Sequence, residues 1–225
     1  MNGVGMRVKV CGLTLLRDVR LAEAAGVEWV GVVVEAFSPR AVGREAAVAL
    51  ARAARKPVVF VVVNMPAEDM AALAEVARPT AFQLHGAETT DLVARMRTAL
   101  PGSVELWKAV APGEGATGAT VETLVSQVQE LASAGVARVV LDTRLGGRKE
   151  ETSPRLDLDL ARDFVEASPL PCLVAGGLAL DDLAQVWKTV RPYGLDLSSG
   201  LELRPGVKDP AKMRRLAGLL GSGAA

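Results

Sequence analysis

Two reactive side chains stand at the ends of apolar, β-branched runs. Cys11 closes the run RVKVC (7–11), and Asp142 closes ARVVLD (137–142). A thiol and a carboxyl can both exchange protons when their surroundings shift their ionisation. Each also has an alternative structural interpretation. A cysteine in such a run is commonly a buried hydrophobe, and an aspartate after a strand commonly caps a helix. The choice depends on where the fold places the two groups.

The sequence contains few of the histidine and cysteine residues that commonly bind zinc. It holds one histidine, His85, and two cysteines, Cys11 and Cys172, and their spacing matches no zinc-binding pattern. We therefore expect no metal. Two distant cysteines also differ from the dense frameworks of secreted disulfide proteins and indicate a reducing, cytoplasmic setting. Cys172 lies inside an apolar run and is interpreted as a buried hydrophobe.

Charge and length narrow the class of protein. The 225 residues include 26 acidic and 26 basic side chains, so net charge favours neither nucleic acid nor an anionic membrane as a partner. No run approaches the roughly 18 apolar residues of a membrane helix, and the first residues lack a signal-peptide pattern. We expect a soluble monomer or homodimer whose partner is a small molecule.

Short apolar runs recur along the chain and predict strands. Because these runs are apolar at nearly every position, they are typical of parallel strands covered on both faces. Between the runs lie segments with helical spacing, and Gly26 and Gly135 fall where a helix would end in a left-handed residue. The expected strands are 7–11, 29–34, 58–63, 81–84, 104–110, 137–142, 171–176 and 194–198. The expected helices include 17–26, 43–55, 67–77, 89–100 and 121–135.

This alternation predicts an α/β fold, a single (β/α)8 TIM barrel, with a doubly wound open sheet as the alternative. No linker divides the chain, so we expect one domain over 1–225, with frayed ends at 1–6 and 221–225. Segment 111–120 is expected to be a flexible loop. Because active sites of such barrels lie at the carboxyl ends of the strands, polar residues that end a strand are the best candidates.

Several motifs satisfy this criterion, and their order resembles that of the phosphoribosylanthranilate isomerase family of tryptophan biosynthesis. AGGL alone occurs in many phosphate-binding barrels, whereas the other motifs in this order are together specific. The resemblance spans nearly the whole chain. It rests on KVCGLT (9–14), SPR (38–40), QLHG (83–86), LDT (141–143), AGGL (175–178), DLSSGLE (196–202) and GVKD (206–209).

The resemblance implies an Amadori rearrangement without cofactor, in which Cys11 is the general base and Asp142 the general acid. The base must reach its thiolate form near neutral pH, and the acid must keep its proton. Among binding residues, Arg40 matches a family arginine that holds a carboxylate, with a solvated loop arginine as the alternative. Asp196 matches an aspartate near the polar groups of the substrate, with ordering of the serine loop as its alternative role. Gln83 and His85 either contact substrate or bond within the mouth of the barrel, and Lys108 is a weaker candidate.

The resemblance also implies a phosphate site in the loops after the seventh and eighth strands. Backbone N–H groups and small residues suit a phosphate there, although two ordinary tight turns would have the same composition. The residues concerned are Gly176, Gly177, Ser198, Ser199 and Gly200. The tryptophans Trp29, Trp107 and Trp187 are expected to pack in the fold rather than against a ligand.

One segment departs from the family pattern. After the sixth strand the chain reads GGRKEETSPRLDLD (146–159), which is longer and more charged than the usual loop. The departure leaves open a relative that isomerises another aminated sugar phosphate, in a secondary pathway for instance. A protein that only binds phosphate is a third possibility, but the retention of both Cys11 and Asp142 argues against it.

Overall fold

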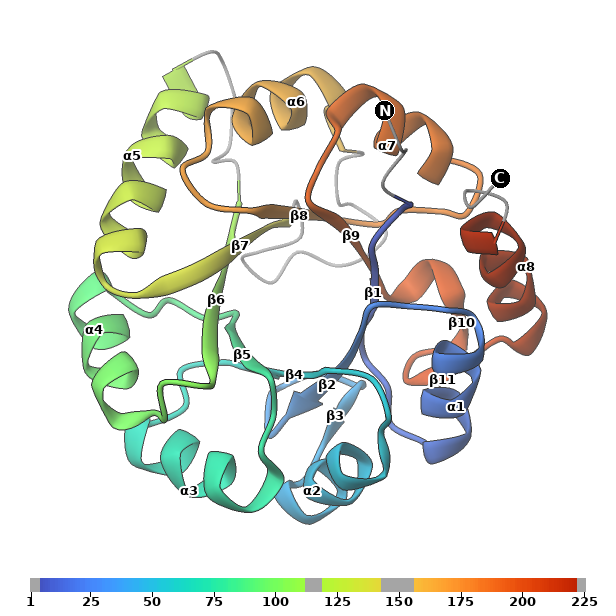
Figure 1. The fold of residues 1–225 in the computed structure, drawn as a ribbon, viewed down its shortest axis with the longest axis horizontal. Helices are drawn as coiled ribbons and strands as arrows, with labels where there is room; N and C mark the ends of the chain where they lie inside the picture. The colour runs from blue at the N-terminus through green and yellow to red at the C-terminus, as the bar shows by residue number, and fades with distance from the viewer. Residues whose placement is uncertain (1–4, 112–118, 143–155, 222–225) are drawn as a thin grey trace.

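The computed structural model describes residues 5–111, 119–142 and 156–221, and its centre is a closed barrel of parallel strands (Figure 1). Neighbouring strands follow one another around the barrel, and β1 pairs with both β9 and β2. This last pairing closes the sheet and rules out the open alternative. The barrel strands are β1 (Val8–Val10), β2 (Trp29–Val34), β4 (Val58–Val62), β5 (Ala81–Leu84), β6 (Glu105–Val110), β7 (Val136–Asp142), β8 (Cys172–Ala175) and β9 (Gly194–Leu197).

Helices surround the barrel on its outside (Figure 1). Gly26 and Gly135 follow α1 and α5 with φ of 82° and 93°, as the sequence predicted for residues that turn the chain into the next strand. The helices are α1 (Leu16–Ala24), α2 (Arg44–Ala53), α3 (Ala67–Ala77), α4 (Thr90–Ala99), α5 (Ala119–Ser133), α6 (Leu158–Ala167), α7 (Leu183–Val190) and α8 (Pro210–Gly221).

Alternate residues of each strand enter two different cores. In β1, Val8 and Val10 pack outward into the large core beneath the helices. Lys9 and Cys11 lie between these valines in the sequence, and the period of two places both side chains inside the barrel. Inward-facing residues are apolar at the amino end, where the rings of Trp29 and Trp107 pack edge to face with centroids 5.5 Å apart.

Several elements near the mouth of the barrel were not foreseen. A short strand, β3 (Ala41–Val42), adds to the edge of β2. After β9 come a 3₁₀ turn, η2 (Ser199–Leu201), and an antiparallel hairpin of β10 (Glu202–Arg204) and β11 (Val207–Lys208). The predicted strands themselves are confirmed, and no predicted strand end differs from the observed one by more than one residue.

Some sequence expectations fall outside the described residues. Most of the expected loop at 111–120 lies there, although α5 already begins at Ala119. The altered segment at 146–159 lies there up to residue 155. Of the expected frayed ends, 1–4 and 222–225 also lie there, whereas Gly221 is the last residue of α8.

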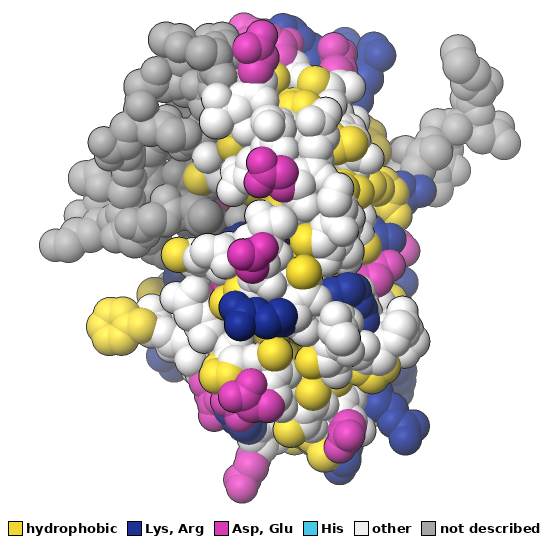
Figure 2. All heavy atoms as spheres, turned by 90° about the vertical axis from the view of Figure 1, so that its left-hand side faces the viewer, with side chains coloured by type: hydrophobic (Ala, Val, Ile, Leu, Met, Phe, Trp, Pro, Cys, Tyr) yellow, Lys and Arg dark blue, Asp and Glu magenta, His cyan; other side chains and the backbone are white. Residues whose placement is uncertain are grey.

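The outer surface seen in Figure 2, on the side of α4 and α5, carries apolar side chains scattered among charged ones. Such scattering is usual for the surface of a water-soluble protein. Within the described residues, no helix combines the length and apolar character that a membrane crossing needs.

The tryptophan pair inside the barrel generates a stability prediction. Trp107 is fully buried, so Trp107→Ala should lower the free energy of unfolding by about 3–5 kcal/mol because it leaves a large cavity. Trp187 packs only partly buried against the outer core, so the control Trp187→Ala should cost about 1 kcal/mol. Urea unfolding followed by circular dichroism measures both, and equal losses would contradict the proposed packing of the interior.

Candidate active site

A cavity of about 440 Å³ opens at the carboxyl ends of the barrel strands, a size suited to a small molecule. It brings together every residue that the sequence singled out as catalytic, substrate-binding or phosphate-binding. The strands and the loops that follow them supply these residues, as expected for this fold. The predicted residues that line the cavity are Cys11, Arg40, Gln83, His85, Asp142, Gly176, Gly177, Asp196, Ser198, Ser199 and Gly200.

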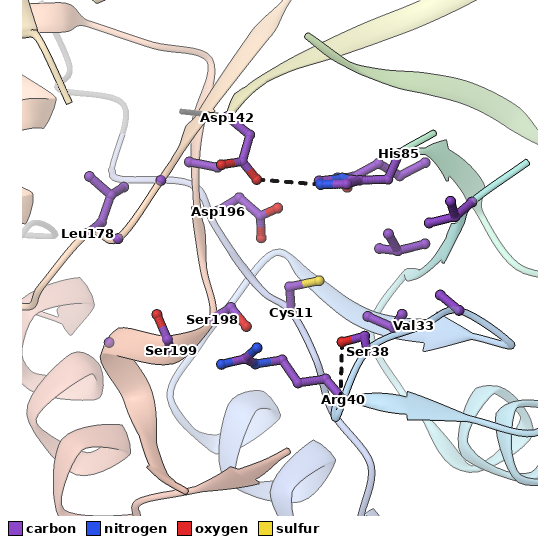
Figure 3. A pocket seen from close by; sticks show the side chains of 18 of the residues that line it. Cys11, Val33, Ser38, Arg40, His85, Asp142, Leu178, Asp196, Ser198 and Ser199 are labelled. Carbon is purple, nitrogen blue, oxygen red and sulfur yellow. Dashed lines mark hydrogen bonds and ion pairs between the residues drawn. The ribbon is translucent and has the colours of Figure 1, made fainter. Parts of the chain in front are cut away.

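Cys11 and Asp142 face the cavity from different walls of the barrel, at the ends of β1 and β7 (Figure 3). The backbone N–H of Cys11 donates to the carbonyl of Leu197 at 2.8 Å, which fixes the end of β1 against β9. Only 9% of Cys11 is exposed, whereas the side chain of Asp142 is 15% exposed. The carboxyl of Asp196 lies between the two in the view of Figure 3.

The surroundings of Cys11 act on its thiol in opposite directions. Burial raises the pKa of Cys11, and the nearby charge of Lys9 lowers it without cancelling the rise. A general base would need the opposite net shift, so these protein groups alone do not favour the thiolate form of Cys11. Lys9 is the group on the protein that opposes the effect of burial most strongly.

Lys9 and Asp196 form a buried ion pair below the cavity. The Nζ of Lys9 donates to Oδ2 of Asp196 at 2.8 Å, and the lysine is completely buried. Burial acts to lower the pKa of Lys9, but Asp196 and Cys11 outweigh it and the net shift is upward, so the ammonium form is kept. Burial also raises the pKa of Asp196, and Lys9 opposes that rise.

His85 and Gln83 form a short network toward Asp142. The Nε2 of Gln83 lies 3.3 Å from Nδ1 of His85, and because an amide nitrogen only donates, Nδ1 accepts and the ring proton is on Nε2. That Nε2 lies 3.7 Å from Oδ2 of Asp142. Burial lowers the pKa of His85, so the ring is neutral near pH 7 and the 3.7 Å contact is not an ion pair.

Arg40 is held by a partner that the sequence analysis did not assign. Its guanidinium grips Glu202 in a bidentate manner, with Nε 2.9 Å from Oε1 and Nη2 2.8 Å from Oε2. Lys208 donates to the same carboxylate at 3.0 Å and to the carbonyl of Ser198 at 3.2 Å. Burial acts to raise the pKa of Glu202, but the two cations outweigh it and the net shift is downward.

The two loops expected to hold phosphate lie against each other. Gly176 and Gly177 have φ of 104° and 69°, a backbone conformation that favours glycine. Gly200 approaches the other loop so closely that a Cβ atom there would lie 2.2 Å from the carbonyl oxygen of Leu178. Ser198 and Ser199 add hydroxyl groups to the same wall of the cavity (Figure 3).

Lys108, the weaker candidate, belongs to a structural cluster beside the cavity. It donates to the carbonyl of Gly86 at 2.8 Å and to Glu88 at 3.0 Å. Glu88 also accepts from the backbone of Asn64 at 2.8 Å, so the cluster ties together the loops after β4 and β5. It holds the chain next to His85 but does not line the cavity.

Cys172 is buried in β8, and burial raises the pKa of its thiol to about 12, in agreement with its interpretation as a hydrophobe. Sequence analysis missed Lys9, Glu202 and Lys208, although all three lie in the quoted motifs. For Lys9 a signal existed, because a charged residue inside an apolar strand shares a face with the residue two positions later. Among the described residues, no group of three or more His, Cys, Asp or Glu could hold a metal ion.

Comparison with known families identifies the chain. Residues 8–218 match the family model described as N-(5'phosphoribosyl)anthranilate (PRA) isomerase. The chain belongs to the phosphoribosylanthranilate isomerase family. Within this family, it is 38% identical to the N-(5'-phosphoribosyl)anthranilate isomerase of Rhodopseudomonas palustris over 92% of each chain. It is 33% identical to that of Haloferax volcanii, over 92% of this chain and 90% of the relative.

Solved structures of phosphoribosylanthranilate isomerases share the fold. The crystal structure of the protein from Thermus thermophilus is 33% identical, with a TM-score of 0.77 over 96% of this chain and 99% of that one. A structure from Thermotoga maritima gives 25% identity and a TM-score of 0.78 over the same shares of the two chains. The family resemblance drawn from the sequence motifs is therefore confirmed.

The Arg40–Glu202–Lys208 cluster generates a prediction. Glu202→Gln leaves two cations near each other without their shared anion, so it should lower the free energy of unfolding by about 2–4 kcal/mol at pH 7. Because the folded-state pKa of Glu202 is depressed, this difference is present above the ordinary pKa of a glutamate and is lost as pH falls through the folded-state value.

The control for Glu202→Gln is Arg215→Gln, which breaks the exposed pair of Arg215 and Asp181 on the outer surface. An exposed pair contributes less than about 1 kcal/mol. Urea unfolding at pH 7 and at lower pH values compares the two variants. A loss for Glu202→Gln no larger than that of the control would contradict the stabilising role of the Arg40–Glu202–Lys208 cluster.

Proposed function

We propose that the protein converts N-(5-phosphoribosyl)anthranilate to 1-(2-carboxyphenylamino)-1-deoxyribulose 5-phosphate, the isomerase step of tryptophan biosynthesis. The observation that carries the proposal is one cavity, in a member of this family, lined by both Cys11 and Asp142. Binding alone would not need both a thiol and a carboxyl in one cavity. We propose that the enzyme is cytoplasmic and that each chain forms one barrel domain. The protein would act as a monomer or a homodimer.

In the proposed reaction, Asp142 gives its proton to the ring oxygen of the ribose, and the furanose opens to a protonated Schiff base. Cys11, as thiolate, takes the proton from the adjacent sugar carbon. The electron pair of that C–H bond forms a double bond between the two carbons, and the π pair of the imine moves to its nitrogen. The resulting enolamine tautomerises to the ketose. Proton transfers of this kind each contribute about 10²–10⁴-fold to a rate. One carbon is oxidised as its neighbour is reduced, so no cofactor or metal ion is needed.

The charges of Arg40, Glu202 and Lys208 support the binding of an anionic substrate. Arg40, Glu202 and Lys208 together carry one excess positive charge when all are ionised, and Arg40 lines the cavity. We propose that Arg40 holds the anthranilate carboxylate while Glu202 keeps its guanidinium in place. The 5-phosphate would bind the loops of Gly176–Gly177 and Ser198–Gly200, whose glycines permit close backbone approach.

The remaining polar groups would orient the sugar. Oε1 of Gln83 and Oδ1 of Asp196 are buried acceptors at the cavity, and neither has a hydrogen-bond partner in the described structure. Buried acceptors are usually satisfied, so substrate hydroxyl or amine groups are suitable donors. We propose that His85, which is neutral, donates from Nε2 near Asp142 and orients either that carboxyl or the substrate.

Two substitutions test the assigned roles. Cys11→Ala and Asp142→Asn should each lower kcat by about 10²–10⁴-fold while substrate binding stays measurable, because each removes a proton-transfer group. The fluorescence decay of freshly generated phosphoribosylanthranilate reports turnover. The matched control is Cys172→Ala, which removes the other thiol of the chain and should leave kcat unchanged.

An unchanged rate in Cys11→Ala or in Asp142→Asn would reject the role of that residue. Turnover of a different aminated sugar phosphate, followed by the appearance of its ketose product, tests the second candidate function, which the altered segment at 146–159 favours. Turnover of that compound without turnover of phosphoribosylanthranilate would replace the proposed substrate.

A further inference from the structure

The complete burial of Lys9 is unusual for a lysine. Lys9 stands in the middle of β1, and no part of it reaches solvent. Transfer of an ammonium group into a protein interior costs several kcal/mol, and an ion pair with good geometry only offsets this cost. A pair of apolar residues would often serve stability as well, so the pair of Lys9 and Asp196 calls for another role.

The side chain of Lys9 runs alongside the sulfur of Cys11. A Cβ atom added to Gly31 would lie 3.0 Å from the sulfur of Cys11 and 3.1 Å from Cε of Lys9. Gly31 on β2 therefore leaves room for both side chains. The charge of Lys9 lowers the pKa of the Cys11 thiol, while its Nζ keeps the 2.8 Å contact with Asp196.

The other charged groups around Cys11 are already engaged. Lys208, from the hairpin after β9, also lowers the pKa of Cys11, but it is bound to Glu202 and to the carbonyl of Ser198. Asp196, from β9, acts in the opposite direction to Lys9. Lys9 is thus the cation with the largest effect on the thiol.

Three other ionisable groups line the cavity with Cys11. His85 follows β5 and Asp142 ends β7, and the two lie 3.7 Å apart. The guanidinium of Arg40 is bound to Glu202. His85 is neutral near pH 7 because burial lowers its pKa, so it does not supply a compensating charge to the sulfur.

We propose that Lys9 is a positioning residue that shares its ammonium between Asp196 and Cys11 and stabilises the thiolate during proton removal. The inference rests on the proposed role of Cys11 as the base. When Cys11 takes the substrate proton and becomes a neutral thiol, Lys9 keeps its own three protons and its contact with Asp196. No proton passes through Lys9, and its effect is electrostatic.

This role makes the effects of two substitutions opposite in sign. Lys9→Met removes the compensating cation, so the pKa of the Cys11 thiol should rise. Asp196→Asn removes the anion that competes for Lys9, so the ammonium group can interact with Cys11 alone. The pKa of the Cys11 thiol should therefore fall. A merely structural ion pair predicts no such opposition, because either substitution breaks the same contact.

The test is the rate of Cys11 alkylation by iodoacetamide as a function of pH, measured by mass spectrometry of the Cys11 peptide in the full-length protein without substrate. Only the thiolate reacts, so the midpoint of the profile reports the thiol pKa. At pH 7.5 we expect Lys9→Met to react roughly tenfold more slowly than wild type and Asp196→Asn roughly tenfold faster, each corresponding to about one pKa unit. Cys172, which is buried and whose pKa burial raises to about 12, should stay unmodified in every sample, so its alkylation reports any unfolding.

Profiles that shift in the same direction in both variants, or in neither, would overturn the proposal. If Lys9→Met does not fold, a downward shift in Asp196→Asn still supports the proposal and an unchanged or upward shift rejects it. The acidic limb of the profile of kcat/KM against pH should shift to higher pH in Lys9→Met, as the alkylation profile does. Because alkylation needs no turnover, failure of the isomerase assay with the expected alkylation shifts would refute the proposed function alone.

Discussion

The pairing of β1 with β9 on one side and with β2 on the other is the constraint on which the site depends. This closure places Cys11 over the inside of the barrel, and it puts Asp142 on another wall of the same cavity. It also removes the thiol from water. The same geometry that brings the proposed acid and base to one cavity therefore works against ionisation of the Cys11 thiol.

The buried charges at the mouth of the barrel form two groups, and the charges within each group are paired. Lys9 and Asp196 form one group below Cys11, and Glu202 joins Arg40 to Lys208 in the other. Each charge is paired, which limits the penalty of burial. Their partners come from β1, β9, the loop after β2 and the hairpin after β9, so the charged site exists only when these segments lie together.

Much of the fold followed from the sequence, because apolar runs and helical periodicity are local signals. The motifs likewise placed the eleven candidate residues, since the carboxyl ends of parallel strands must meet at one face. The pairing of Arg40 with Glu202 and of Lys9 with Asp196 did not follow. These partners are 162 and 187 residues apart, and only closure of the barrel decides which charges become neighbours. The raised pKa of Cys11 was unforeseen for the same reason, because burial is a property of the closed barrel.

The central claim is that Cys11 and Asp142 act on the two ends of one reacting unit, the ring oxygen and the carbon next to the imine. The most direct measurement is an experimental structure with a product analogue whose imine-forming nitrogen is held as a stable amine. The account predicts the sulfur of Cys11 within about 3.5 Å of the sugar carbon that loses its proton, and a carboxylate oxygen of Asp142 within hydrogen-bond reach of the former ring oxygen. An analogue bound in the cavity with either group more than one sugar ring away from its atom would contradict it.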